Sequence, residues 1–584
     1  MLKRFITCIA GLMIFCAFHS DHLFGASDAV NPSQTSKLSE TKGISDAVRG
    51  DYLVPAVELI PFGQAEYSQK NKALLITGDG SGFHWRGSGL PAGSFQLWVT
   101  YYCSDREARA TLQFNGKEKT KPQLYMGLET IDKFYDSNDR PIAGLKERVS
   151  KPQPYFFREY WGTFDVGNHA DLKMSYRGGR DIRVQSIEFN RVNRHQEDLS
   201  PLLNSAIGFY ENATPTNALT RCVFDTSTQR ESAQSSIAVC GIALAAFAIS
   251  HDIDRAPKES RQRTLNLLRA LNGKVAGIHL NRHKSGLFQH FVDSRTGNSA
   301  SEFSTIDTAI LVSGALLARN VFHDPEITAE TDALWNSIDW SRCVIKAGPV
   351  APKFYFTGAD MDKFKDLSDP DKIRGIGMFN EYILLAYFCQ QHENLKHPSG
   401  GRRTIMPDLS RLPMQVFRNR VMLGNHIQPS FLVQFPFFMS ELCGDELYFS
   451  FVAAQGVADR AYNTEKFRDG SVWGVSAGWS PKKPYAVLNF INNPDHVVSP
   501  PIMAGFIPVM PIAADDLFRL YQNPAQRQQL PFGEILPQHV PGTILKSDRI
   551  PGVDFSVWLY GLAWNHPRLG SEWFRKNTRF TFNQ

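Results

Sequence analysis

Three carboxyl residues stand at the predicted starts of two apolar helices, where they could take part in acid–base chemistry. Glu302 and Asp307 flank the start of an apolar segment at 304–321, and Glu381 heads the run EYILLAYF. An acid beside an apolar helix must be capped, paired or used, because burying an unpaired charge is costly. Since Glu302 and Glu381 come from different helices, they could reach a substrate from opposite sides as general acid and base.

Each carboxyl also has a structural explanation. Glu302 could simply complement the dipole of the helix that follows it. Ser304 and Asp307 have the spacing of a capping box, with Ser304 as the N-cap. Asn380 could cap the second helix by itself, which would leave Glu381 available for another role.

Aromatic and acidic residues outside the predicted helices are candidates for binding a substrate. Sugar rings stack on aromatic side chains, and Trp473 and Trp479 lie in a loop-rich segment, although a tryptophan is more often part of a core. Asp293 and Asp495 lie in good turn sequences, so each could either make its own turn or bind hydroxyl groups.

The sequence offers no motif for a metal or a cofactor. His283, His290 and His323 are close in sequence, but they lack the spacing of ligands on one face. The chain contains neither a phosphate-cradling glycine loop nor a Gly-x-Ser-x-Gly motif. We therefore expect no metal and no cofactor.

Composition and the first residues bear on partners and localisation. The 584 residues include 63 Lys and Arg against 58 Asp and Glu, and this slight charge of +5 argues against nucleic acid as a partner. Lys3 and Arg4 precede about 14 apolar residues, which suits a signal peptide and falls short of the roughly 20 residues of a membrane span. We expect a signal peptide over 1–26, export to the periplasm or the cell exterior, and no membrane span in the mature chain.

Six cysteines follow the predicted signal peptide. Their even number fits disulfides in an oxidising compartment. Cys240 and Cys389, however, lie in apolar helical runs, which favours buried thiols. The six are Cys103, Cys222, Cys240, Cys343, Cys389 and Cys443.

The mature chain is predicted to divide into a flexible linker at 27–50, a β domain at 51–195 and a helical domain at 196–584. Short alternating runs separated by Gly, Asp and Asn clusters predict a β-sandwich of the jelly-roll kind, without catalytic residues. These runs are at 73–77, 94–102, 108–115, 170–177 and 181–190. Helical spacing follows at 234–250, 259–272, 304–321, 326–338, 379–391, 444–461 and 511–521. Some of these helices are apolar nearly all round, which indicates inner helices covered by outer ones.

Several phrases of the helical segment resemble the glycoamylase-like family, which includes bacterial β-1,2-glucanases and the processing domains of cyclic β-1,2-glucan synthases. The phrases are HFVDSRTG (290–297), SEFSTIDTAILVSGALLAR (301–319), FNEYILLAY (379–387), HPSG (397–400), WGVSA (473–477) and DHVVSPPIMAG (495–505). The resemblance implies an (α/α) toroid with a sugar cleft, following the β-sandwich. It also implies a secreted glycoside hydrolase that cleaves a β-linked glucan, with β-1,2-glucan the leading substrate, by a two-carboxylate mechanism.

The resemblance assigns roles to the candidate residues. It implies catalytic roles for Glu302, Glu381 and Asp307, and substrate-binding roles for Asp293, Asp495, Gln434, Trp473 and Trp479. Like charges on Asp307 and Asp293 would raise the pKa of Glu302. We therefore expect Glu302 to be the general acid and Glu381 to be the base or nucleophile.

The chain also departs from the family's pattern. After WGVSA the family has an acid followed by Gly-Pro, whereas this chain has Gly478-Trp479-Ser480-Pro481, and the segment around Asn565 differs as well. These differences fall in segments that line the family's cleft. They leave two alternatives open: a catalytically weak glycan-binding member of the same fold, or a polysaccharide lyase, because related toroids do that work.

Overall fold

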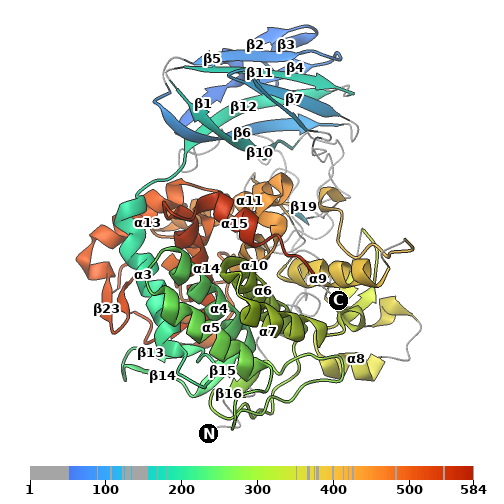
Figure 1. Ribbon diagram of the computed structural model, residues 1–584. Coiled ribbons are helices and arrows are strands. Elements are labelled where there is room, and N and C mark those ends of the chain that lie inside the picture. Colours follow the sequence, from blue (N-terminus) through green and yellow to red (C-terminus); the bar gives the residue numbers. More distant parts are fainter. Residues whose placement is uncertain are drawn as a thin grey trace, which may run out of the picture.

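The N-terminal part of the chain forms a β domain of two antiparallel sheets, and a helical domain follows it (Figure 1). The structure is a computed structural model that describes residues 51–87, 90–104, 108–121, 124, 133–134, 155–167, 169–178, 181–349, 352–364, 369–373, 375–376, 380–397, 400–411, 414–417, 420–423, 427–480, 483–543 and 546–582. The predicted signal peptide and linker lie outside these residues. The order of a β domain before a helical domain is confirmed.

Alternating buried and exposed residues explain the strands of the β domain. One sheet has six strands in the order β10-β6-β12-β4-β3, with β1 paired to β12, and the other has five in the order β2-β5-β11-β7-β8. The strands are β1 (Tyr52–Pro55), β2 (Ile60–Phe62), β3 (Ala65–Ser68), β4 (Ala73–Ile76), β5 (Gly82–Gly87), β6 (Gly93–Cys103), β7 (Arg109–Phe114), β8 (Lys117–Lys121), β10 (Phe157–Val166), β11 (Ala170–Arg177) and β12 (Ile182–Arg191). In β11 every second residue faces inward. Phe114 of one sheet contacts Phe164 and Phe189 of the other, with ring centroids 4.8 and 6.2 Å apart, so the two sheets share one core.

The helical domain begins five residues after the β domain's last strand. Its helices are α3 (Gln196–Ala213), α4 (Ile237–Asp252), α5 (Pro257–Leu271), α6 (Thr305–Phe322), α7 (Pro325–Asn336), α8 (Gly358–Phe364), α9 (Tyr382–Lys396), α10 (Phe431–Met439), α11 (Glu446–Phe467), α12 (Pro500–Phe506), α13 (Ile512–Gln522), α14 (Gly552–Asn565) and α15 (Gly570–Asn577). Short strand pairs lie between them: β13 (Val223–Asp225) with β14 (Arg230–Glu231) and β25 (Arg549–Pro551), β15 (Gln234–Ser236) with β16 (Phe291–Asp293), β17 (Val344–Lys346) with β18 (Lys353–Phe354), β19 (Met414–Phe417) with β9 (Lys133–Phe134) and β20 (Arg420–Leu423), β21 (Gly478–Ser480) with β22 (Lys483–Ala486), and β23 (Gln528–Leu530) with β24 (Gly533–Ile535).

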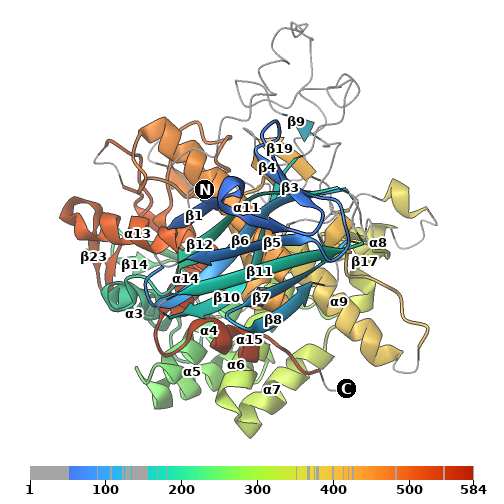
Figure 2. The same cartoon turned by 90° about the horizontal axis from the view of Figure 1, so that it is seen from above.

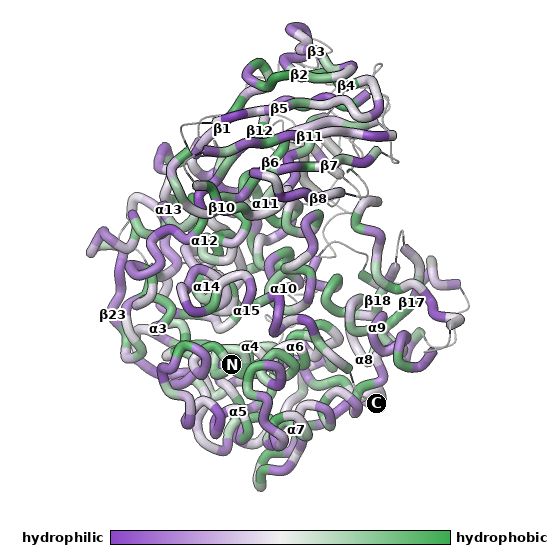
Figure 3. The backbone as a smooth tube through the Cα atoms, turned by 45° about the horizontal axis from the view of Figure 1, so that its top comes forward, coloured by the Kyte–Doolittle hydropathy of each residue, from purple (hydrophilic) through white to green (hydrophobic). Residues whose placement is uncertain are grey.

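Apolar helices occupy the middle of this domain. Hydrophobic residues run along α4 and α6 (Figure 3), and α4 is buried on all sides from Ile237 to Ser250. Contacts follow the sequence α4–α6–α9–α10–α12–α14 and return to α4, while α3, α5, α7, α11 and α13 pack against these helices from outside. Helices α4 and α6 can approach closely because glycines face each other where they cross. A Cβ on Gly314 of α6 would lie 1.8 Å from the carbonyl oxygen of Gly241 in α4.

The β domain rests on the helical domain through the six-stranded sheet, whose strand β10 contacts α11 (Figure 1), and from above both sheets lie over the helices (Figure 2). Tyr160 of β10 stacks on Phe449 of α11 with ring centroids 4.1 Å apart, and its backbone NH donates to Ser450 Oγ at 2.8 Å. Lys121 of β8, whose Nζ lies 2.6 Å from Glu159 Oε1 within the β domain, also reaches Glu446 Oε2 of α11 at 3.5 Å. The interface therefore combines aromatic packing with an ion pair.

Most predicted elements match observed ones. All seven predicted helical segments correspond to helices, and the five predicted strand runs correspond to β4, β6, β7, β11 and β12. The missed helices include α10 and α12, which contain proline or begin with it, and α14, which is almost wholly apolar. The six cysteines that follow the predicted signal peptide are all buried, and none of them forms a disulfide with another described cysteine, as the apolar context of Cys240 and Cys389 indicates. Within the described residues α6 is long and apolar enough to cross a membrane, but 83% of it is buried inside the protein.

Candidate functional site

The start of α6 brings two of the predicted carboxyls to one histidine. Ser304 caps the helix: its Oγ accepts from Asp307 NH at 3.2 Å and its hydroxyl donates to Asp307 Oδ2 at 2.5 Å. His290, on the neighbouring chain segment, places Nδ1 2.8 Å from Glu302 Oε1 and Nε2 3.4 Å from Asp307 Oδ1. The backbone NH of His290 also donates to the Glu302 carbonyl at 2.8 Å. Ser304 is therefore the N-cap, but the capping box is not closed, because the Ser304 NH donates to the Phe288 carbonyl at 2.9 Å and the carboxyl of Asp307 accepts from the Ser304 hydroxyl instead. Asp307 has a second role as a neighbour of His290.

His290 sets the charge of this cluster. Burial alone would lower its pKa, but the negative charge of Asp307 and the hydrogen bond and charge of Glu302 outweigh burial and raise it. Burial would raise the pKa of Glu302, but His290 holds it below the ordinary value. Asp307 is more deeply enclosed, and burial raises its pKa in spite of His290. Glu302 is therefore the carboxyl that stays ionised, and its charge favours the protonated form of His290.

Glu381 has the opposite environment. It directly precedes α9, whose first NH, on Tyr382, donates to Asn380 Oδ1 at 2.9 Å, so Asn380 makes the cap. The residue as a whole is half-buried, but its oxygen Oε2 is enclosed and has no hydrogen-bond partner among the residues that the structure describes. Burial, followed by the nearby charge of Asp307, raises the pKa of Glu381 to about 7. A large share of Glu381 is therefore still protonated at neutral pH, where an ordinary glutamate is ionised.

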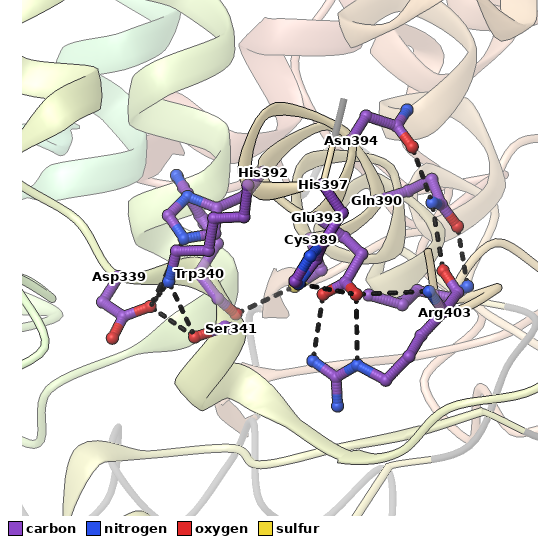
Figure 4. Close-up of polar contacts among 12 residues, drawn as sticks. Asp339, Trp340, Ser341, Cys389, Gln390, His392, Glu393, Asn394, His397 and Arg403 are labelled. Atoms are coloured by element: carbon purple, nitrogen blue, oxygen red, sulfur yellow. Dashed lines mark hydrogen bonds and ion pairs between the residues drawn. The ribbon is translucent and has the colours of Figure 1, made fainter. Parts of the chain in front are cut away.

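Polar contacts anchor the second half of α9, the helix that Glu381 precedes (Figure 4). Glu393 is paired with Arg403 at 3.1 Å, and Gln390 Oε1 accepts from the backbone NH of Ile405 at 2.7 Å. On another side of the helix the thiol of Cys389 donates to the Trp340 carbonyl at 3.3 Å. These contacts fix the second half of the helix that Glu381 precedes.

A cavity of about 320 Å³ opens beside the histidine. His290 and Phe291 form one part of its wall, and Trp479, Tyr485 and Arg549 form another. The Trp479 and Tyr485 rings lie 4.8 Å apart, and the Arg549 guanidinium lies 5.6 Å from the Trp479 ring. The cavity thus has aromatic walls that suit a sugar ring, and it reaches the partner of Glu302.

Two predicted substrate-binding residues are placed in the core instead. The prediction for Trp473 is wrong, because its ring is fully buried and its Nε1 donates to Asp516 Oδ2 at 2.9 Å. The prediction for Gln434 is also wrong. Its side chain has no exposed surface, and its amide donates to the carbonyl of Ile502 at 3.1 Å. Both residues are used to pack helices and loops together, so neither can touch a sugar.

The two predicted aspartate ligands lie in turns. Asp293 Oδ1 accepts from the backbone NH groups of Arg295 and Thr296 at 3.0 and 2.9 Å, so it closes its own turn. Asp495 lies in the turn that the His496 NH closes onto the Asn493 carbonyl. Neither aspartate is among the described residues that line the cavity, whereas Trp479 is.

The expected order of the catalytic pKa values is reversed. We predicted a raised pKa for Glu302 from crowding by Asp307 and Asp293, but His290 lies between Glu302 and Asp307 and lowers it. The raised pKa belongs to Glu381. His290 was considered only as a metal ligand, and in the part of the chain that the structure describes no group of residues has the arrangement of a metal site.

Sequence comparisons find no family model and no curated protein that matches this chain. Among solved structures, an endo-β-1,2-glucanase from Chitinophaga pinensis, in complex with sophorotriose and glucose, is 12% identical over 66% of this chain and 98% of its own, with a TM-score of 0.50. A β-1,2-glucanase from Parabacteroides distasonis is 12% identical over 91% of this chain and 98% of its own, with a TM-score of 0.47. An endo-β-1,2-glucanase from Talaromyces funiculosus in complex with sophorose is 8% identical over 64% of this chain and 85% of its own, with a TM-score of 0.44. The first likeness confirms, at the level of the fold, the resemblance that the sequence phrases indicate.

Proposed function

We propose that this protein is a glycoside hydrolase that cleaves a β-linked glucan, with Glu381 as general acid and Glu302 as base or nucleophile. The observation that carries the proposal is the contrast between the two carboxyls: Glu381 has a pKa of about 7 and an enclosed oxygen without a partner, while His290 keeps Glu302 ionised. Glycosidases need one protonated and one ionised carboxyl, and here the environments push the two pKa values apart.

Glu381 supplies the proton. A protonated carboxyl whose oxygen has no protein partner can donate to the glycosidic oxygen of a bound sugar as the bond to the anomeric carbon breaks. Its pKa near neutrality balances the two requirements of a general acid, because the group is protonated before the step and is still acidic enough to give up the proton.

Glu302 supplies the negative charge. As an ionised carboxylate it can activate water or attack the anomeric carbon, on the face of the sugar opposite the leaving group. His290 binds one of its oxygens, which orients the carboxylate, and Asp307 binds the other side of the imidazole ring. Asp307 thereby stabilises the charged form of His290 and acts through it, so we assign Asp307 a positioning role.

The fold supports the same proposal. The closed series of contacts from α4 to α14, with other helices outside, is what an (α/α) toroid requires, and the paired sheets of residues 51–195 fit a β-sandwich. We assign the toroid to residues 196–584. The fold shared with an endo-β-1,2-glucanase makes β-1,2-glucan the first substrate to test. The apolar stretch after Lys3 and Arg4 supports export through a signal peptide over 1–26, before a linker at 27–50.

A panel of purified glycans tests the proposal. Incubation with β-1,2-glucan should release reducing sugar, and Glu381→Gln should lose that activity while remaining folded. Unsaturated products that absorb in the ultraviolet, formed from uronic-acid glycans, would instead indicate a lyase. Glycan binding without any product would indicate a binding protein that has kept the cleft.

A further inference from the structure

The segment 473–477 is held by three buried aspartates that take no part in the proposed reaction. Trp473 Nε1 donates to Asp516 at 2.9 Å, and the backbone NH groups of Gly474 and Val475 each lie 3.3 Å from an oxygen of Asp459. The hydroxyl of Ser476 donates to Asp554 Oδ1 at 2.7 Å. Four consecutive residues are therefore bound by carboxyl groups. Gly474 has a φ of 88°, in the left-handed region that favours glycine, so the backbone of this segment has one defined conformation.

Asp554 also makes contacts that lead from this segment toward the cavity. It is the third residue of α14 and is almost completely buried, and its other oxygen accepts from Ser499 Oγ at 3.0 Å and from Gln538 Nε2 at 2.7 Å. Gln538 Nε2 also lies 3.3 Å from the carbonyl of Ala477. The Gln538 amide lies so close to Gly478 that a Cβ there would be 2.0 Å from its oxygen. Asp554 thus holds Gln538, and Gln538 lies against the backbone at 477–478.

The next residue is Trp479, which forms part of the cavity wall. Its strand, β21, pairs with β22 so that Gly478 lies opposite Ala486, and Tyr485 contacts the Trp479 ring. The cavity wall also includes Val553, the residue before Asp554. The contacts therefore run without a break from Asp554 through Gln538 and Gly478 to the aromatic wall.

We propose that Asp554 is a positioning residue that, through Gln538, sets the backbone at Gly478 and so places the Trp479 ring where a sugar unit of the glucan stacks on it. This inference rests on the proposed function, because it assigns the cavity to the substrate. It assigns Asp554 an effect on substrate binding and none on the proton transfer that Glu381 performs.

The experiment measures affinity without turnover. Full-length protein carrying Glu381→Gln is titrated with β-1,2-linked glucooligosaccharides by calorimetry, alone and with Asp554→Asn, Trp479→Ala or both. The Asn amide keeps one acceptor oxygen and puts an NH2 group in place of the other, so it can no longer accept from Ser476, Ser499 and Gln538 together, which weakens the hold on Gln538. We expect each single change to weaken binding about tenfold and the pair to weaken it little more, because both act on one contact.

A second variant tests the series of contacts from Asp554 through Gln538 to Trp479 and carries little risk of unfolding the protein. Gly478→Ala displaces only the end of the flexible Gln538 side chain, and we expect it to weaken binding as Asp554→Asn does. In the otherwise wild-type enzyme both changes should raise KM and leave kcat nearly unchanged. The matched control is Glu330→Gln, which removes a buried carboxyl on α7 that accepts from Asn272 and Lys274, away from the cavity, and should leave both constants unchanged.

Three results would overturn the inference. Unchanged affinity in folded Asp554→Asn would do so, as would full additivity of Asp554→Asn with Trp479→Ala, or a loss confined to kcat. If no glycan binds, the proposed function fails. Hydrogen exchange then tests separately whether Asp554 positions the backbone at 477–480. Asp554→Asn should then speed exchange at the 477–480 amides and leave α4 unchanged, and equal exchange in both proteins would refute it.

Discussion

Two groups of buried carboxyls in the helical domain differ in how their oxygens are used. Around the segment 473–477, Asp459 accepts from two backbone NH groups, Ser430 and Asn463, and Asp554 accepts from two serines and a glutamine. At the start of α9, Glu381 Oε2 accepts no hydrogen bond from any residue that the structure describes. Burial nevertheless raises the pKa of all three, to about 6 for Asp459 and about 7 for Asp554 and Glu381.

The comparison shows that a raised pKa does not by itself identify a catalytic acid. Burial produces the same shift in a carboxyl that holds a loop and in one that has a free oxygen. The number of hydrogen bonds that each carboxyl accepts distinguishes the two kinds. A carboxyl whose oxygens all accept from protein donors has no oxygen left for a substrate. Glu381 meets this second condition, and Asp307 at the start of α6 is close enough to contribute to its raised pKa.

The largest expected effect is that of Glu381→Gln. It should lower kcat on β-1,2-glucan about 10³-fold, because the amide cannot protonate the leaving oxygen. An aryl glycoside with a good leaving group needs no proton and should keep most of its rate. Steady-state kinetics on both substrates check this prediction.

Glu302→Gln provides the contrast for that measurement. We expect it to lower kcat on both substrates, because neither can do without the base or nucleophile. Equal losses on both substrates for Glu381→Gln, with selective loss for Glu302→Gln, would restore the roles that we expected from the sequence.

The pH dependence should follow Glu381. Because it must be protonated to act, kcat on glucan should fall about tenfold per pH unit above the Glu381 pKa of about 7. Steady-state kinetics over a pH series check this prediction.

The stability of the protein should depend on the same group. The folded protein holds the Glu381 proton more tightly than the unfolded chain, so this group's contribution to stability declines as pH rises from about 4.5 to about 7. Glu381→Gln should remove that slope from thermal unfolding curves, and an unchanged slope would contradict the assignment.

His290→Gln sharpens the same comparison on the acid side. Without the imidazolium the pKa of Glu302 should rise toward its ordinary value, so the acid limb of the kcat profile should move to higher pH. The alkaline limb, which Glu381 sets, should stay in place. A shift of the alkaline limb alone would show that His290 acts on the other carboxyl.

The smallest expected effect on activity, with a clear effect on stability, is that of Asp459→Asn. The amide would turn NH groups toward donors that are buried, and leaving such groups unsatisfied costs about 1–3 kcal/mol each. Thermal unfolding should therefore occur at a lower temperature than in the wild type, while Glu381→Gln, whose oxygen has no partner, should show no such loss. Equal stability of the two variants would remove the distinction between the two groups.

Local chemistry determined much of what could be predicted. The Ser304 and Asn380 caps depend on neighbouring residues, and both are present. The strand runs and the apolar helices follow from spacing, which depends on a few adjacent residues. The proline-containing α10 was missed because Pro436 is locally unfavourable inside a helix, and only the surrounding helices stabilise this one.

Tertiary structure alone decided the state of each carboxyl. The sequence placed Glu302 near two acids, but the fold puts His290 between Glu302 and Asp307, and one imidazolium reverses the direction of the pKa shift. Trp473 and Trp479 are six residues apart in one loop-rich stretch, yet packing buries the first and exposes the second to a cavity. A pKa and the burial of a side chain both depend on atoms from distant segments, and spacing along the chain carries no information about those atoms.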